Sequence, residues 1–143
     1  MNCLYQNFSE ILIGSHDQVT KEDFLAYAWV SGDHNPIHFD DQIAISMGIE
    51  EGILAQGMLV HCWICQYFDV FLENESKEKK VSFFIEESQT KFNSKTHPGT
   101  GLDFVLKLKK EDEERVYFVA EAVDQKSREK RVTQNFVVRK QDA

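Results

Sequence analysis

The stretch from Gly57 to Leu72, GMLVHCWICQYFDVFL, decides the fold of this chain. Its large apolar residues fall around most of a helical wheel, which is typical of a helix buried among other elements. A helix over this stretch would be about 24 Å long, at 1.5 Å per residue. We therefore expect one long central helix with the rest of the chain packed around it. The apolar residues are Leu59, Val60, Trp63, Ile64, Tyr67, Phe68, Phe71 and Leu72.

After this helix, apolar residues recur at every second position. Residues 73–80, ENESKEKK, predict a solvated loop, and residues 109–115, KKEDEER, predict a charged hairpin tip. The run from Arg131 to Arg139 is rich in Val, Thr and Phe and predicts a last strand. A period of two is that of β-strands. The alternating residues are Phe83 and Ile85, then Leu102, Phe104, Leu106 and Leu108, then Val116, Phe118, Ala120 and Ala122.

A first strand is expected within residues 7–19, where short apolar alternations occur. Together these segments predict an α+β protein with an antiparallel sheet of about five strands. With one long helix beside such a sheet, the sheet is expected to curl around the helix, which takes the place of a second sheet.

The segments before the long helix are predicted to be short helices and an irregular loop. Thr20 can cap a helix that should end near Gly32. Residues 31–40, SGDHNPIHFD, are dense in turn formers and predict a loop. A second short helix is expected from Asp41 to Met47, with Gly48 ending it.

Composition and charge limit the class of protein. The chain has 143 residues, 42% of them hydrophobic, so we expect a single domain over residues 1–143 with its own core. Sixteen Lys and Arg against 24 Asp and Glu give a net charge of −8. This charge repels phosphate backbones and anionic bilayers, so neither nucleic acid nor membrane is expected as a partner.

The sequence also predicts a location and a redox state. No apolar run approaches the roughly twenty residues that span a bilayer. The N-terminus, MNCLYQNFSE, lacks the basic and then apolar pattern of a signal peptide. We therefore expect a cytoplasmic protein whose three cysteines are reduced thiols.

Asp33 and His38 are candidate catalytic residues. They lie five positions apart in a loop that Pro36 stiffens, so their side chains can converge on one point. A carboxylate and an imidazole that reach the same water are suited to proton transfer near neutral pH. The alternative is that both residues only cap helices or bond to nearby backbone, as Asp and His in turns often do.

Gly57 is a candidate binding residue at the start of the long helix. Free N–H groups and the positive end of the helix dipole favour negative charge there. An N–H directed at a carbonyl oxygen could stabilise an enolate or oxyanion beside the Asp33 and His38 pair. The alternative is a glycine that only permits a tight turn into the helix.

These motifs resemble the MaoC-like hot-dog dehydratases, a family that includes the (R)-specific enoyl-CoA hydratases. The family's hydratase motif reads S-G-D-x-N-P-I-H-x-D, followed by an Ala, a Gly and H-G-M-L at the head of the central helix. This chain has SGDHNPIHFD at residues 31–40, then Ala44, Gly48 and QGML at residues 56–59. The resemblance implies one MaoC-like hot-dog domain over residues 1–143.

The resemblance also implies roles for these residues. Asp33 and His38 would activate a water that adds to C3 of a trans-2-enoyl thioester and return a proton to C2. Gly57 would donate its N–H to the thioester carbonyl. Ser31 and Asn35 would support the loop, and no metal or redox cofactor is implied, since the substrate is carried on CoA or phosphopantetheine.

This sequence departs from the family pattern at several positions. Gln56 stands where the family usually has a His, and an amide cannot exchange a proton. Cys65 stands where some hydratases have a Ser near the bound water, and a thiol is a weaker donor. In the stretch that resembles the family's F-to-P-G-D segment, Thr100 replaces the Asp and Lys95 a common proline. These changes bear on substrate preference and activity rather than on the fold.

A CxxC motif in the long helix has a structural explanation. Cys62 and Cys65 form a CxxC motif beside His61, but they lie inside an apolar helix rather than at its N-terminus, so we interpret them as small buried residues. A zinc site would need a second pair of ligands. His61 has no partner that the sequence identifies.

Three lysines could contact the phosphates of a bound CoA. They are Lys91, Lys95 and Lys107.

Three hypotheses remain open at this stage. The first is an enoyl-thioester hydratase or 3-hydroxyacyl dehydratase acting on an acyl-CoA or an acyl-carrier protein. The negative charge favours CoA, because an acidic carrier would be repelled. The second is a hot-dog module that binds an acyl thioester or a protein without turnover, and the third is an acyl-CoA thioesterase. Hot-dog proteins generally pair through their sheets, so a homodimer is expected.

Overall fold

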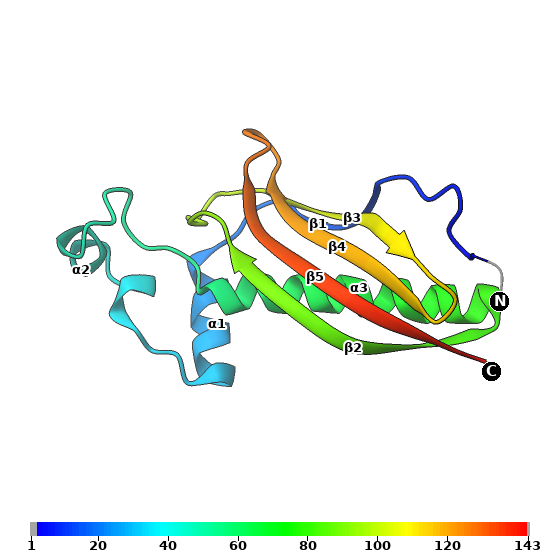
Figure 1. Cartoon of the computed structure of the whole chain (residues 1–143). Helices are drawn as coiled ribbons and strands as arrows, with labels where there is room; N and C mark the ends of the chain where they lie inside the picture. The colour runs from blue at the N-terminus through cyan, green and yellow to red at the C-terminus, as the bar shows by residue number, and fades with distance from the viewer. Residues whose placement is uncertain (1–2, 143) are drawn as a thin grey trace.

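The computed structural model describes residues 3–142 of the chain. Over these residues, five strands and one long helix form the body of the molecule, and shorter helices lie at one end (Figure 1). The elements in chain order are β1 (Ile11–His16), α1 (Lys21–Ser31), the 3-10 turn η1 (Pro36–His38), α2 (Asp41–Ser46), α3 (Gly57–Lys79), β2 (Val81–Phe92), β3 (Leu102–Glu111), β4 (Arg115–Asp124) and β5 (Lys130–Asp142).

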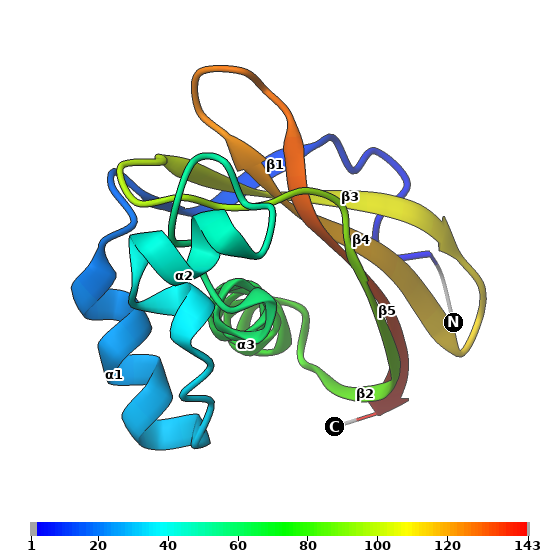
Figure 2. The ribbon, with the colours of Figure 1, turned by 90° about the vertical axis from the view of Figure 1, so that its left-hand side faces the viewer.

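The strands form one antiparallel sheet in the order β1-β3-β4-β5-β2. Figure 2 looks along α3 and shows the sheet curving around it, as in a hot-dog fold. The predicted α+β class, the five strands and the central helix are therefore confirmed. β1 and β2 are the two edges of the sheet, and β2 pairs only with β5 within the described part of the chain.

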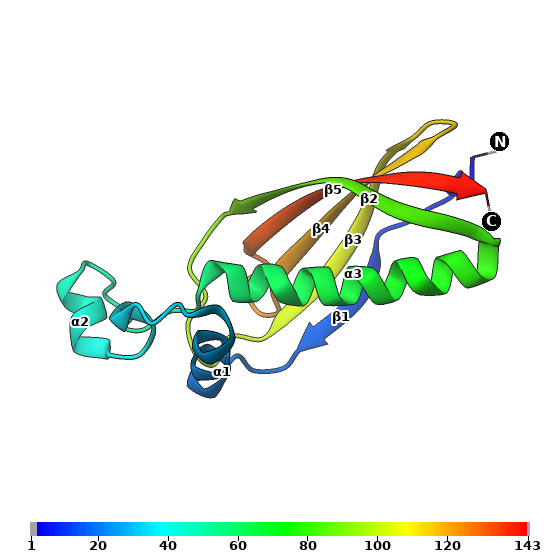
Figure 3. The ribbon, with the colours of Figure 1, turned by 90° about the horizontal axis from the view of Figure 1, so that it is seen from below.

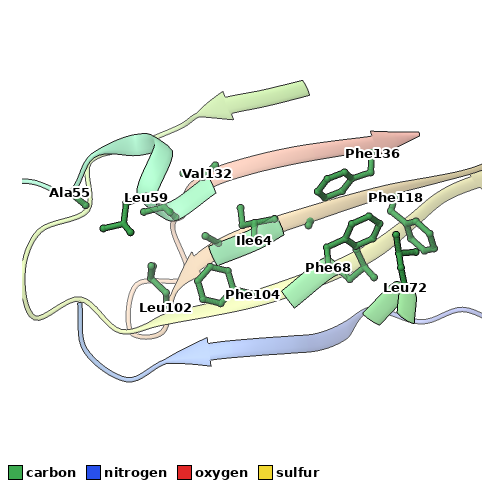
Figure 4. Packing of buried hydrophobic residues seen from close by; sticks show 14 of the residues in the cluster. Ala55, Leu59, Ile64, Phe68, Leu72, Leu102, Phe104, Phe118, Val132 and Phe136 are labelled. Carbon is green, nitrogen blue, oxygen red and sulfur yellow. The ribbon is translucent and has the colours of Figure 1, made fainter. Parts of the chain in front are cut away.

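One face of α3 supplies the centre of the core. Its buried side chains follow each other at helical spacing and contact inward-facing residues of the strands (Figure 4). The Phe68 ring stacks on Phe136 of β5 with centroids 4.0 Å apart, and it meets Phe118 of β4 edge-on at 5.6 Å. The buried residues of the helix are Leu59, Val60, Ile64, Phe68 and Leu72.

The opposite face of α3 is not covered, which differs from the expectation of a helix buried all round. Met58 is 47% exposed and Val70 is 53% exposed. Figure 3 shows α3 lying across the concave side of the sheet, with α1 and α2 beyond its N-terminal end. The apolar residues spread around the helical wheel therefore predicted the helix, but they did not predict which side of it the sheet covers.

The long helix also continues further than predicted. The expected loop at residues 73–80 is helical as far as Lys79, and Lys80 ends the helix in the left-handed conformation, at φ 54°. Glu and Lys are good helix formers, and pairs four residues apart stabilise an exposed helix. Two such pairs occur here, Glu73 with Lys77 at 2.7 Å and Glu75 with Lys79 at 3.4 Å. Charge alone indicated exposure, not the absence of helix.

The predicted shorter helices are confirmed. α1 begins with a capping box, in which the Thr20 side chain accepts from Asp23 N–H and the Asp23 carboxylate accepts from Thr20 N–H. It ends at Gly32, which has φ 79° and donates its N–H to Ala28 O. α2 is followed by Gly48 at φ 88°. No helix among residues 3–142 is both long and apolar enough to cross a membrane.

Truncating Phe68 tests the central packing. We expect Phe68→Ala to lower the free energy of unfolding by about 3–5 kcal/mol, because it removes a ring packed on both sides and leaves a cavity. Val30→Ala, at a position of α1 that is 88% exposed, should change it by less than about 0.5 kcal/mol. Urea denaturation of both variants measures this difference, and equal losses would contradict the packing described.

Candidate active site

The loop after α1 is held by its own short-range hydrogen bonds. Ser31 Oγ donates to Tyr27 O at 2.7 Å and accepts from Asp33 N–H at 3.1 Å. The Asn35 side chain accepts from Ile37 N–H at 3.3 Å and so caps the 3-10 turn that carries His38. Ser31 and Asn35, the predicted supporting residues, thus bond within the loop and position Asp33 and His38.

The loop brings Asp33 and His38 face to face. Oδ2 of Asp33 lies 3.7 Å from Nε2 of His38, too far for a direct hydrogen bond but close enough for one water to contact both atoms. His38 is buried, and its Nδ1 lies 2.7 Å from Leu54 O. A carbonyl oxygen only accepts, so Nδ1 carries a proton, and in the neutral ring Nε2 keeps its lone pair on the side of Asp33.

The start of α3 forms the second part of the site. Gly57 is the first residue of the helix, and no side chain caps it. A Cβ placed on Gly57 would lie 2.7 Å from Cδ1 of Phe92, so the Phe92 ring approaches the backbone more closely than any other residue would permit. In this first turn Leu59 N–H donates to Gln56 O at 3.0 Å. The N–H groups of Gly57 and Met58 have no carbonyl four residues earlier within the helix and are available to a ligand.

Gln56 stands directly before the helix and is 2% exposed. Its Nε2 donates to Phe24 O at 3.0 Å, which ties α1 to the start of α3. Its Oε1 has no hydrogen-bond partner among the residues that the structure describes. An amide in this place braces the fold and presents a free acceptor, but it cannot transfer a proton.

These groups line one cavity of about 550 Å³. Asp33 and His38 come from the loop, Gln56 and Gly57 from the start of α3, and Phe92–Thr96 from the end of β2 and the segment after it. The segment is anchored by a hydrogen bond from Ala55 N–H to Thr96 O at 2.7 Å. The Asp33 and His38 pair, helix N–H groups and an apolar wall thus meet in one place, which suits a ligand with a polar head and an apolar chain.

A family model of the MaoC-like domain matches residues 12–134 of this sequence. The chain belongs to the MaoC-like dehydratase family. The search of curated proteins gave no match for it.

Solved structures show the same hot-dog fold as this MaoC-like protein. (R)-hydratase PhaJ1 from Pseudomonas aeruginosa superposes with a TM-score of 0.71 at 20% identity, over 94% of this chain and 80% of that one. The (R)-hydratase of A. caviae involved in PHA biosynthesis gives a TM-score of 0.69 at 19% identity, over 96% and 99% of the two chains. SAV2348 from Staphylococcus aureus, solved in complex with CoA, gives 0.58 at 13% identity, over 94% and 73%.

Cys65, which the resemblance aligns with a Ser near the bound water of some hydratases, does not line the cavity. Cys65 lies two turns further along α3, where its Sγ is 3.5 Å from Nε2 of His61. Burial raises the pKa of its thiol, and the nearby Cys62 and Asp69 add to that rise. A raised pKa disfavours the reactive thiolate. The prediction that both cysteines are buried is wrong for Cys62, which is exposed because it lies on the side of α3 that the sheet does not cover, and Cys65 is only half-buried.

Two of the lysines proposed for CoA phosphates lie in different surroundings. Lys95 lines the cavity and is exposed. Lys107 is instead paired with Glu121 at 2.8 Å and Glu10 at 3.4 Å. It is therefore already neutralised by two carboxylates.

Sequence reasoning missed Phe92 as the neighbour of Gly57, and it left His61 without a partner. His61 Nδ1 lies 2.8 Å from Gln134 Oε1 and 3.1 Å from Thr90 Oγ1. A signal existed for Gln134, which alternates with Val132 and Phe136 and should face the core. Thr90 is out of phase with Phe83 and Ile85 and turns inward only because the register of β2 shifts between Ile85 and Glu87. Polar residues at core-facing positions call for partners.

Arg131 braces the cavity wall from behind. Its Nη1 donates to Lys95 O at 2.8 Å and to Ser94 Oγ at 3.2 Å. Its Nη2 donates to Asp124 Oδ2 at 2.8 Å. Arg131 lowers the pKa of Asp124 from 3.8 to about 2, with help from the N–H groups of Ser127 and Lys126.

This pair predicts a pH-dependent stability. Because the pKa of Asp124 is lower in the folded state, its contribution is present above the unfolded value of 3.8 and is lost as the pH falls through about 2. Asp124→Asn should lower the free energy of unfolding by about 2 kcal/mol at pH 7 and by much less near pH 2. Asp69→Asn, at an exposed site on α3, is the control. Denaturation curves over pH 2–7 check this, and a loss independent of pH would contradict it.

Proposed function

We propose that this protein catalyses the reversible hydration of trans-2-enoyl thioesters to (3R)-hydroxyacyl thioesters. The observation that carries the proposal is that Asp33, His38 and the first residue of α3 line one cavity. A base for water and a donor for the thioester oxygen are the two groups that this addition needs.

The steps follow from the chemistry of the groups. A water bound between Asp33 Oδ2 and His38 Nε2 loses a proton to the pair as its oxygen bonds to C3. The C2=C3 electron pair moves toward the thioester carbonyl, and the N–H of Gly57 stabilises the enolate oxygen. The proton returns to C2, so one water has been added across the double bond and nothing is oxidised or reduced.

Several features favour CoA as the carrier of the acyl group. The net charge of −8 would repel an acidic carrier protein. Lys95 lies exposed at the cavity, where it can meet a phosphate. The names of two similar structures are those of (R)-hydratases, and a third was solved with CoA. No step of the proposed reaction needs a metal or a redox cofactor.

Hydration is tested by the loss of the conjugated thioester absorbance of crotonyl-CoA and of a longer enoyl-CoA. We expect wild-type protein to consume at least one of them. Asp33→Asn and His38→Ala should each lower kcat about 10²–10⁴-fold, because each removes a group that handles the proton.

Substitution of Gly57 supplies an independent test of the oxyanion site. Gly57→Ala should lower kcat/KM at least about tenfold, because the new methyl collides with the Phe92 ring beside the oxyanion position. Adding Phe92→Ala should recover part of this loss by making room. An active Asp33→Asn variant, or no turnover with either acyl length, would contradict the proposal.

A non-catalytic binding module is the second candidate, and Gln56 is the observation that favours it. Its amide stands where the family usually has a histidine and cannot take part in proton transfer. Tight binding of enoyl-CoA without loss of absorbance would support this alternative. Release of free thiol from acyl-CoA would instead support a thioesterase.

We also propose that the protein forms a homodimer through the β2 edge and the uncovered side of α3. Both present large apolar side chains, with Phe84 59% exposed on β2 and Val70 53% exposed on α3. An unpaired strand edge with apolar residues readily pairs with another chain. Light scattering should give about twice the 16.6 kDa of one chain, and a monomeric mass would contradict this.

A further inference from the structure

The cavity runs from the surface into the core. Its lining combines Lys95, which is exposed, with Val60 and Val132, which are 1% and 2% exposed. A thioester whose carbonyl lies at Gly57 and whose carrier leaves toward solvent therefore directs the far end of its acyl chain toward the two valines.

A layer of polar side chains lies directly beyond these valines. In the β2–β5 ladder, Phe92 is paired with Val132, and both line the cavity. The next pair of the same parity, one step deeper, is Thr90 with Gln134. His61 lies one helical turn after Gly57, so α3 adds a third polar side chain at this level. We call these three residues, His61, Thr90 and Gln134, the polar layer.

Hydrogen bonds within the polar layer leave one polar group without a partner. Gln134 Oε1 accepts from Thr90 Oγ1 at 2.5 Å and from His61 Nδ1 at 2.8 Å. Gln134 Nε2 has no partner within residues 3–142, although the residue is 0% exposed. The amide oxygen is thus satisfied twice, and the amide nitrogen is not satisfied at all.

The core resumes immediately beyond the layer. The next inward residue of β5 is Phe136, whose ring stacks on Phe68. In Figure 4, Val132 lies near the first turns of α3 and Phe136 lies further along it, so position 134 falls between the cavity wall and the aromatic core. An unsatisfied donor in such a place destabilises the fold and calls for an explanation.

We infer that Gln134 is a specificity residue whose free N–H recognises a neutral oxygen at the far end of the acyl chain. This inference rests on the proposed binding of an acyl thioester in the cavity. A hydroxyl or carbonyl oxygen at the right length accepts the N–H. A methyl group there leaves the donor unpaired, and a carboxylate costs far more to bury.

Binding of saturated thioesters tests the inference without requiring turnover. Calorimetry compares methyl-ended acyl-CoA of four, six and eight carbons with their ω-hydroxy counterparts. Wild-type protein should bind the ω-hydroxy compound of one length about tenfold more tightly than its methyl-ended partner, as expected for pairing one buried donor.

Two matched substitutions assign the effect to the polar layer. Gln134→Met keeps the size of the side chain but removes the donor, and it should abolish or reverse the preference. Gln89→Met makes the same chemical change at an exposed position of β2 and should leave the preference intact. Melting curves of both variants verify that they fold.

The outcomes separate this inference from the proposed function. A preference that Gln134→Met removes supports the inference, whether or not the enoyl forms are hydrated. Equal binding of methyl-ended and ω-hydroxy compounds at all three lengths, or a preference unchanged by Gln134→Met, overturns it. Absence of hydration alone contradicts only the proposed catalysis, and absence of any acyl-CoA binding overturns both.

Discussion

One face of α3 packs along the concave side of the sheet, and this contact positions everything else in the molecule. Phe68 stacks on Phe136 near the middle of the helix, and the smaller residues Leu59 and Val60 fill the N-terminal end. The helix axis is thereby held against the strands, and its first residue, Gly57, comes to lie beside the end of β2. The position of the free N–H groups at the helix start depends on core packing rather than on the residues around them.

The loop that carries Asp33 and His38 is held in a different way. Asp33 and His38 belong to a loop whose shape comes from local bonds of Ser31 and Asn35, and the loop is joined to the rest of the site by His38 Nδ1 and Leu54 O. Short-range hydrogen bonds of this kind need no core around them. The site therefore combines a rigid helix terminus with a loop that is shaped largely by its own sequence, and both parts face the same cavity.

Two buried glutamines distinguish this chain from a purely apolar design. Gln56 keeps an unpaired oxygen at the cavity, and Gln134 keeps an unpaired nitrogen one layer deeper. Because unsatisfied buried polar groups destabilise a fold, their position at and beneath a cavity links them to what the cavity holds. In the proposed reaction the first stands near the reacting end of the thioester and the second near its far end.

The sequence by itself determined the features that depend on neighbouring residues. The helix cap at Thr20, the helix end at Gly32, the loop motif of residues 31–40 and the period-two strands were all evident, because each depends on contacts only a few residues apart. Only the tertiary structure decided the features that depend on distant pairing. These are the uncovered face of α3, the approach of Phe92 to Gly57 and the meeting of His61, Thr90 and Gln134. Strand register and helix rotation bring such residues together across tens of positions, and no local pattern encodes them.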